Sequence, residues 1–231
     1  MKLFTKMLAP AGLALCALTA TVPAAAQVDG RVATADVSRA IIGTTALQTA
    51  FSQIGTTYAA QIEQRQTKQQ ELTTLLMPFD TNGNGQLDEA ELPAVQSSAS
   101  FAQIQTLEAE VQAISNQVNG ARIYAVEQIL AQYPAALTDV TTAQQVVIVL
   151  QPDAIQFAGE DADITPLIST ALNTRLPSVA IVPPADWRPS RQSAQIFQEI
   201  QQTLLLAQQI QAQQAAQEGQ PAPAAPAPTG R

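Results

Sequence analysis

A short stretch of the chain has the residue types and the spacing of a calcium-binding loop. Between Phe79 and Leu92 the sequence is D-T-N-G-N-G-Q-L-D-E-A-E, which matches the EF-hand loop pattern without a gap. Calcium takes hard oxygen ligands from alternating positions of such a loop, one of them a backbone carbonyl, and a bidentate carboxylate from its last position. The predicted ligands, with Gln86 acting through its carbonyl, are Asp80, Asn82, Asn84, Gln86, Asp88 and Glu91.

Two further positions of this loop have expected structural roles. Gly85 allows the sharp bend, and Leu87 is the apolar position that normally pairs with a second loop. The sequence contains no second loop, and two of the ligands, Asn82 and Asn84, are uncharged, so we expect weak affinity, about 10⁻⁴ to 10⁻³ M as in extracellular modules. The alternative interpretation is that Asn-Gly-Asn-Gly only turns the chain between two helices.

The composition excludes several classes of function. The chain has no His and one Cys, Cys16, so Cys/His and Ser/His/Asp catalysis and the usual zinc ligands are absent. We therefore expect that the protein is not an enzyme. The net charge of −8 does not favour nucleic acid as a partner. Glu160, Asp161 and Asp163 precede a predicted helix, where acidic residues favour the helix dipole.

The first residues predict export from the cytoplasm. Lys2 and Lys6 precede an apolar run over residues 7–22, and Ala24-Ala25-Ala26 follows, which is the order of a secretory signal peptide. We predict a signal peptide over residues 1–26, which removes Cys16, and a location in the periplasm of a Gram-negative cell envelope.

A long helix is predicted over residues 45–77, where apolar residues are spaced by threes and fours. This apolar face turns polar at Arg65 and Gln69, so it supports only a thin contact with one partner helix.

The partner helix is predicted to begin at Phe101 and to end near Gln132, because a proline disfavours helical backbone at the residue before it, here Tyr133. The two helices form an antiparallel hairpin over residues 45–132, with the EF-hand-like loop 80–91 at its tip.

Short strands are predicted on either side of this hairpin. Residues 31–37 alternate small and β-branched side chains, and residues 146–150 and 154–158 are expected to form a β-hairpin. The early strand should pair with the late ones. A short helix should follow, with Thr165 as N-cap and Leu176 near its end.

The fold class is therefore mainly α with a small β body (α+β), in which a long antiparallel helical hairpin projects from a small oligomerising β-sheet. Residues 27–176 form this domain, with the β-hairpin and short helix at 144–176. One protomer has too small a core to be stable alone, so we expect self-association.

The rest of the chain is predicted to be an extension. Residues 177–189 form a Pro-rich linker that contains Trp187, which packs on its own domain or docks a partner. Residues 190–217 are Gln-rich and form either a marginal amphipathic helix or a solvated segment. Residues 218–231 alternate Pro and Ala, a composition typical of disorder.

In the order of these elements, the chain resembles the Skp/OmpH family of periplasmic chaperones. The resemblance covers residues 28–176 and lies in the signal peptide, the strand at 31–36, the helical hairpin and the closing segment from Val146 to Asp163-Ile164-Thr165. It implies a homotrimer whose helical arms enclose a cavity, and a holdase role toward unfolded outer-membrane proteins.

This chain departs from the family in two respects. Well-known members are strongly basic, whereas this chain is acidic, so its charge does not favour contact with an anionic membrane surface. The EF-hand-like loop and the Gln/Pro extension are additions. The alternative functions are a calcium-responsive EF-hand binding module and a structural helical spacer of the cell envelope.

Overall fold

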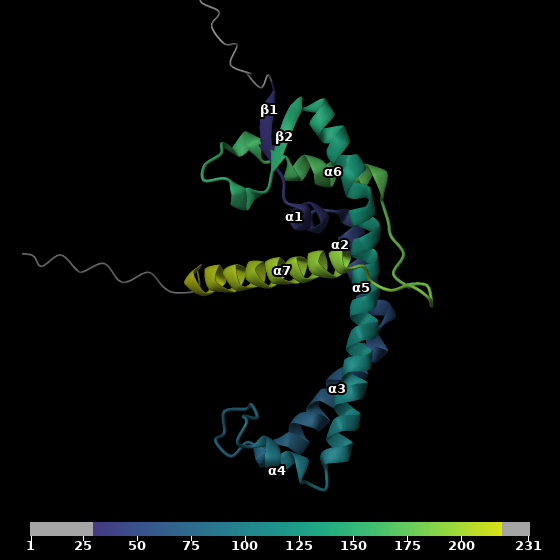
Figure 1. The fold of residues 1–231 in the computed structure, drawn as a ribbon, viewed down its shortest axis with the longest axis vertical. Coiled ribbons are helices and arrows are strands. Elements are labelled where there is room, and N and C mark those ends of the chain that lie inside the picture. Colours follow the sequence, from purple (N-terminus) through teal and green to yellow (C-terminus); the bar gives the residue numbers. More distant parts are fainter. Residues whose placement is uncertain (1–29, 219–231) are drawn as a thin grey trace, which may run out of the picture.

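The computed structural model describes residues 30–218, which form a mostly helical chain with one small sheet (Figure 1). The predicted signal peptide lies outside the described residues, as does the predicted Pro/Ala tail apart from Glu218. Within residues 30–218, no helix combines the length and the apolar character needed to cross a membrane.

The sheet consists of β1 (Arg31–Thr34) and β2 (Val146–Leu150). They pair in parallel, with Val32 opposite Ile148. A parallel pair needs a long crossover connection, and here all the helices from residue 37 to residue 143 supply it. The predicted pairing between the early strand and residues 146–150 is confirmed. The early strand ends before its predicted limit at residue 37, because Asp36 already caps the next helix.

The strand predicted over residues 154–158 is wrong. The chain leaves β2 through the 3-10 helix η2 (Pro152–Ala154) and then adopts no regular strand. Pro152 supplies no backbone N–H for a ladder, and Phe157 is 90% exposed, so this segment has no surface to pack on. The remaining contact of the sheet is a single parallel bridge between Thr34 and Asp163.

The helix predicted over residues 45–77 is divided into α2 (Thr45–Thr57) and α3 (Ala59–Leu76). The break falls at Tyr58, whose backbone is not helical (φ −102°, ψ 19°). A glycine and two β-branched threonines directly precede Tyr58, and these residues are poor helix formers. The preceding helix α1 (Val37–Ile42) is short and is capped by Asp36, which accepts a hydrogen bond from the Arg39 amide at 2.8 Å.

The second long helix, α5 (Phe101–Ala143), runs through Pro134 instead of ending before it. A proline in a helix interior costs about 3 kcal/mol. Tyr133, Ala136 and Val140 are buried on the same side of α5, and Pro134 is exposed on the other. We attribute the continuation of the helix to this burial, which outweighs the lost hydrogen bond.

The two C-terminal helices are α6 (Thr165–Arg175) and α7 (Arg191–Glu218). The predicted start of α6 is confirmed, but Thr165 is its first residue and not its N-cap. The Asp163 carboxylate accepts the Thr165 amide at 3.0 Å, and the Thr165 hydroxyl accepts the Asp36 amide at 3.0 Å. The Gln-rich segment is helical, as one alternative predicts, and residues 205–215 of this helix are exposed to solvent, as the other expects.

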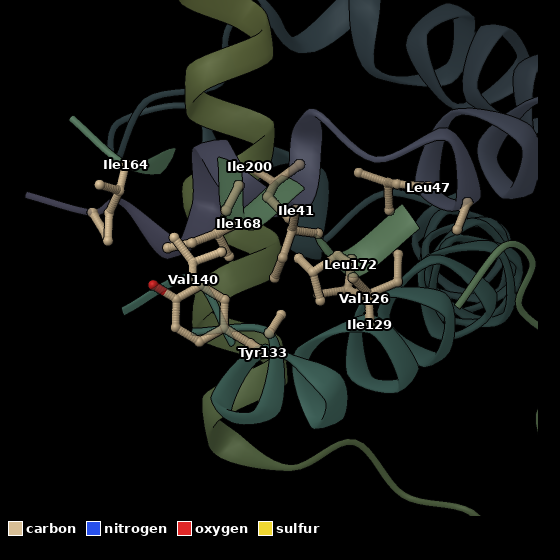
Figure 2. Close-up of a cluster of buried hydrophobic side chains, with 14 of the residues drawn as sticks. Ile41, Leu47, Val126, Ile129, Tyr133, Val140, Ile164, Ile168, Leu172 and Ile200 are labelled. Carbon is tan, nitrogen blue, oxygen red and sulfur yellow. The ribbon is translucent and has the colours of Figure 1, made fainter. Parts of the chain in front are cut away.

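The main core joins α1, the start of α2, α5, α6 and the first turns of α7 (Figure 2). Its side chains are almost all aliphatic and come from segments far apart in the sequence. Those with less than 2% exposure include Ile41, Val126, Ile129, Ile168, Leu172 and Ile200. We call this packed unit, together with the sheet, the body.

The arm consists of α2 beyond its first turn, α3, the part of α5 from Phe101 to Gly120, and the segment that connects α3 to α5, residues 77–100. The helix α3 runs beside α5 in the opposite direction and carries the connecting segment away from the body (Figure 1).

Candidate functional site

The predicted metal loop, residues 80–91, lies at the far end of the arm and is called the tip loop. It follows the 3-10 helix η1 (Met77–Phe79) and precedes the short helix α4 (Leu92–Gln96). Figure 1 shows this segment at the end of the arm opposite to the body.

Two glycines give the tip loop its shape. Gly83 and Gly85 have positive φ angles of 70° and 76°, in the left-handed region that disfavours residues with a Cβ atom. No heavy atom lies within 4 Å of a Cβ built at either position. The glycines are therefore required by the backbone conformation and not by close packing, in agreement with the predicted bend at Gly85.

In the first half of the loop, three predicted ligands bind backbone amides. The two carboxylate oxygens of Asp80 accept from the Asn84 amide at 3.1 Å and from the Gly85 amide at 2.7 Å. The side-chain oxygen of Asn82 accepts from the Asn84 amide at 2.9 Å, and that of Asn84 accepts from the Gln86 amide at 2.7 Å. These side chains are therefore turned inward over their own loop.

The second half of the loop is organised around Glu91, which is 5% exposed. One carboxylate oxygen accepts from the Thr81 amide at 2.6 Å, the Thr81 hydroxyl at 2.7 Å and the Asn82 amide at 3.3 Å. The other oxygen accepts from the Asp88 amide at 3.2 Å. The Thr81 hydroxyl, followed by the Asp88, Thr81 and Asn82 amides, lowers the pKa of Glu91 against the opposing effect of burial.

Asp88 connects the two halves of the loop. It accepts the Asn82 side-chain amide at 3.1 Å and the Ala90 amide at 2.9 Å. The structure thus links five of the predicted ligands in one hydrogen-bonded loop, while Gln86 takes part through its backbone.

The ligand set fits a hard cation in its chemistry, since every predicted donor is an oxygen. In residues 30–218, however, no three His, Cys, Asp or Glu side chains converge at metal-binding spacing. Binding of Ca²⁺ would therefore require carboxylates of the tip loop to exchange their amide partners for the ion.

Leu87, expected to pair with a second loop, packs on the arm instead. It joins a cluster at the end of the arm, the tip cluster, whose buried members are Leu72, Val95, Ile104 and Leu107. Beside it lies a cavity of about 360 Å³ between α3 and the tip loop, lined in part by Leu76, Met77 and Leu87. The sequence gives one indication of this cavity, which is Met77 at the end of the apolar face of α3.

The contact between α3 and α5 is thin between its two apolar clusters. Near the body, Ile54, Tyr58, Val118 and Ala121 are buried together. From there to Leu72 in the tip cluster, α3 contributes no buried side chain. An ion pair between Lys68 and Glu110 at 2.5 Å spans part of this polar stretch.

The other candidate residues have structural partners. Trp187 packs edge-to-face on Tyr124, with ring centroids 5.3 Å apart, and donates to Glu127 at 2.8 Å. Asp163 pairs with Arg39 at 3.1 Å. Burial raises the pKa of Asp163, but hydrogen bonds from Thr165 and the charge of Arg39 hold it below its usual value.

The chain was compared with protein families, curated proteins and solved structures. No family model matches the chain, and no curated protein matches it. Among solved structures, it is similar to the crystal structure of a protein assigned as an outer membrane chaperone (OmpH-like) from Caulobacter crescentus CB15. The identity is 17%, the match covers 65% of this chain and 88% of that chain, and the TM-score is 0.39.

Proposed function

We propose that this protein is a periplasmic holdase chaperone that binds unfolded outer-membrane proteins and prevents their aggregation before membrane assembly. The proposal starts from the resemblance of its element order to the Skp/OmpH family. We also propose that it is not an enzyme, because the sequence has no His and its one Cys, Cys16, lies in the predicted signal peptide.

The observation that carries the proposal is the thin contact within the arm. Between Tyr58 and Leu72 no α3 side chain is buried and a few, such as Ile62, are half-buried, so fewer apolar contacts oppose bending of the helices there than in the two clusters. A holdase must fit clients of many shapes, so a flexible arm suits it better than a rigid one. A structural spacer would instead gain from a continuous apolar contact.

The arm also exposes scattered apolar side chains, some of them next to a cavity at its end. Met77 is 66% exposed and Leu92 is 41% exposed at its end, next to the cavity beside the tip loop. The outward face of α3 is rich in Gln and Thr. Scattered apolar side chains on a polar surface can hold an unfolded chain through many small contacts and still release it.

Self-association through the body completes the proposal. Val147, Ile148 and Leu150 of β2 are between 38% and 51% exposed, as is Val32 of β1. A two-stranded sheet is marginally stable alone, and contact with further copies would cover these side chains. The resemblance to the Skp/OmpH family favours three copies.

The experiment is light scattering after a urea-unfolded outer-membrane β-barrel protein is diluted into buffer that contains the chain without residues 1–26. We expect suppressed aggregation at comparable concentrations, relative to an equal mass of an inert protein. Unchanged aggregation would remove the holdase proposal and favour the spacer or the calcium module.

A second function is favoured by the tip loop: weak binding of Ca²⁺ that stiffens the end of the arm. Because the loop is continuous with η1 and α4, an ion held by Asp80 and Glu91 would fix both sides of the tip cluster.

We expect Ca²⁺, and not Mg²⁺, to protect residues 80–91 from proteolysis. The matched control is Glu91→Gln, which keeps the size of the side chain but removes the bidentate carboxylate. Equal cleavage with and without Ca²⁺ would exclude this function.

A further inference from the structure

A small cavity lies between α3 and α5 at the body end of the polar stretch. Its volume is about 100 Å³. Two arginines, two small polar side chains and two apolar side chains line it: Arg65, Arg122, Ser115, Asn119, Ile62 and Val118.

The two arginines share this cavity without a carboxylate partner among residues 30–218. The ion pairs of the described chain involve other cations, namely Arg39, Lys68 and Arg175. Arg122 is partly buried, and its side chain donates to the Asn119 side-chain oxygen at 3.4 Å. Arg65 is exposed at the same cavity. Arg65 and Arg122 thus line one cavity, and neither forms an ion pair in the part of the chain that the structure describes.

The surroundings of Arg122 disfavour its charged form. Burial lowers the pKa of Arg122, and repulsion from Arg65 lowers it further. Removing part of a guanidinium from water is unfavourable without a counter-charge nearby.

We propose that this cavity binds one small oxyanion, a phosphate or a carboxylate group, between the guanidinium groups of Arg65 and Arg122. A guanidinium offers N–H donors in a planar fork that matches two oxygens of such a group. The Ser115 hydroxyl and the Asn119 side-chain amide supply further donors. A volume of about 100 Å³ is enough for one oxyanion.

A bound oxyanion would also connect the two helices of the arm. Arg65 lies on α3 and Arg122 on α5, just where the apolar contact near the body gives way to the polar stretch. The anion would replace repulsion between the helices by a bridge and would make the arm stiffer at this level. This inference does not depend on the holdase function.

The test is isothermal titration calorimetry of the chain without residues 1–26 with inorganic phosphate, and separately with acetate, at constant ionic strength. Direct binding is measured because phosphate also stabilises folded proteins in general by exclusion from their surface. We expect one site per chain, with phosphate bound more tightly than acetate because it carries more charge. Arg65→Gln and Arg122→Gln should each weaken binding roughly tenfold or more, since each removes one charge-assisted contact.

The matched control is Arg191→Gln, which removes an exposed arginine at the start of α7 and should bind like the parent chain. Circular dichroism establishes that each variant is folded, and Arg65→Gln keeps the test decisive if Arg122→Gln unfolds. Absence of binding to the parent chain, or equal binding by the parent and Arg65→Gln, would overturn the proposal.

Discussion

At the scale of single residues, Glu91 holds the tip loop together, and its titration is a first prediction. Its pKa lies below the usual 4.5 because it accepts hydrogen bonds from Thr81 and nearby amides. A carboxylate with a lowered pKa stabilises the folded loop above its unfolded pKa, and this contribution is lost as the pH falls through the folded value. We expect the loop to open below about pH 4.5, seen as shifts of the Thr81 and Asn82 amide resonances.

The control for this prediction is Glu91→Gln. The variant should show a loop that is already partly open at neutral pH and a smaller change than the parent between about pH 7 and pH 3 at these two amides. If the parent and the variant have the same pH dependence, Glu91 is not the group that organises the loop.

The sequence predicted the position and the bend of this site but not its internal bonding. Spacing alone placed the loop at 80–91, and Gly85 has the backbone that the pattern requires. The sequence could not show that Asp80 and Glu91 accept hydrogen bonds from the loop's own amides, because these bonds depend on side-chain rotamers. Nor could it bring Arg65 beside Arg122, since their proximity depends on the register between two helices.

At the scale of elements, the continuation of α5 through Pro134 gives a second prediction. Pro134 is exposed and provides no N–H for the carbonyl one turn earlier. Pro134→Ala should raise the free energy of unfolding by about 1–3 kcal/mol. A smaller effect opposes this gain, because the unfolded chain is less restricted without the proline. Urea unfolding at a fixed protein concentration measures it. A loss of stability would show that Pro134 makes contacts that the helix needs.

The docking of α7 gives a third prediction. Ile200 is fully buried against the body, whereas Leu206, farther along the same helix, is 57% exposed. Ile200→Ala should cost about 2–5 kcal/mol or release α7, seen as faster hydrogen exchange over residues 191–218. Leu206→Ala, the matched control, should change stability by less than about 0.5 kcal/mol. Similar effects of the two substitutions would contradict the observed packing.

The elements differ from their predictions where tertiary contacts outweigh local signals. The apolar periodicity located both long helices, but the rule that a helix ends before a proline failed at Pro134, because Ala136 and Val140 are buried beyond it. Alternation over residues 154–158 resembled a strand, yet the segment has no neighbour to pair with, and Phe157 points into solvent. A short pattern does not tell whether a partner exists.

At the scale of the whole molecule, the exposed sheet gives a fourth prediction. A charged side chain placed on β2 should separate the protomers of the proposed oligomer. Ile148 of β2 is 41% exposed, and in the proposed oligomer it would be covered. Ile148→Lys should shift the molar mass measured by light scattering after gel filtration toward that of the monomer. Leu206→Lys, a substitution of an exposed leucine on α7, should leave the mass unchanged. An unchanged mass for Ile148→Lys would exclude the sheet as the interface.

The central claim is that the protein recognises unfolded outer-membrane proteins, and binding to one client in two states tests it most directly. Fluorescence anisotropy of a labelled β-barrel protein would be measured as the chain is added, once with the client freshly diluted from urea and once with it folded in detergent micelles. We predict saturable binding to the unfolded client and none to the folded one. Equal binding to both states, or to neither, would contradict the account.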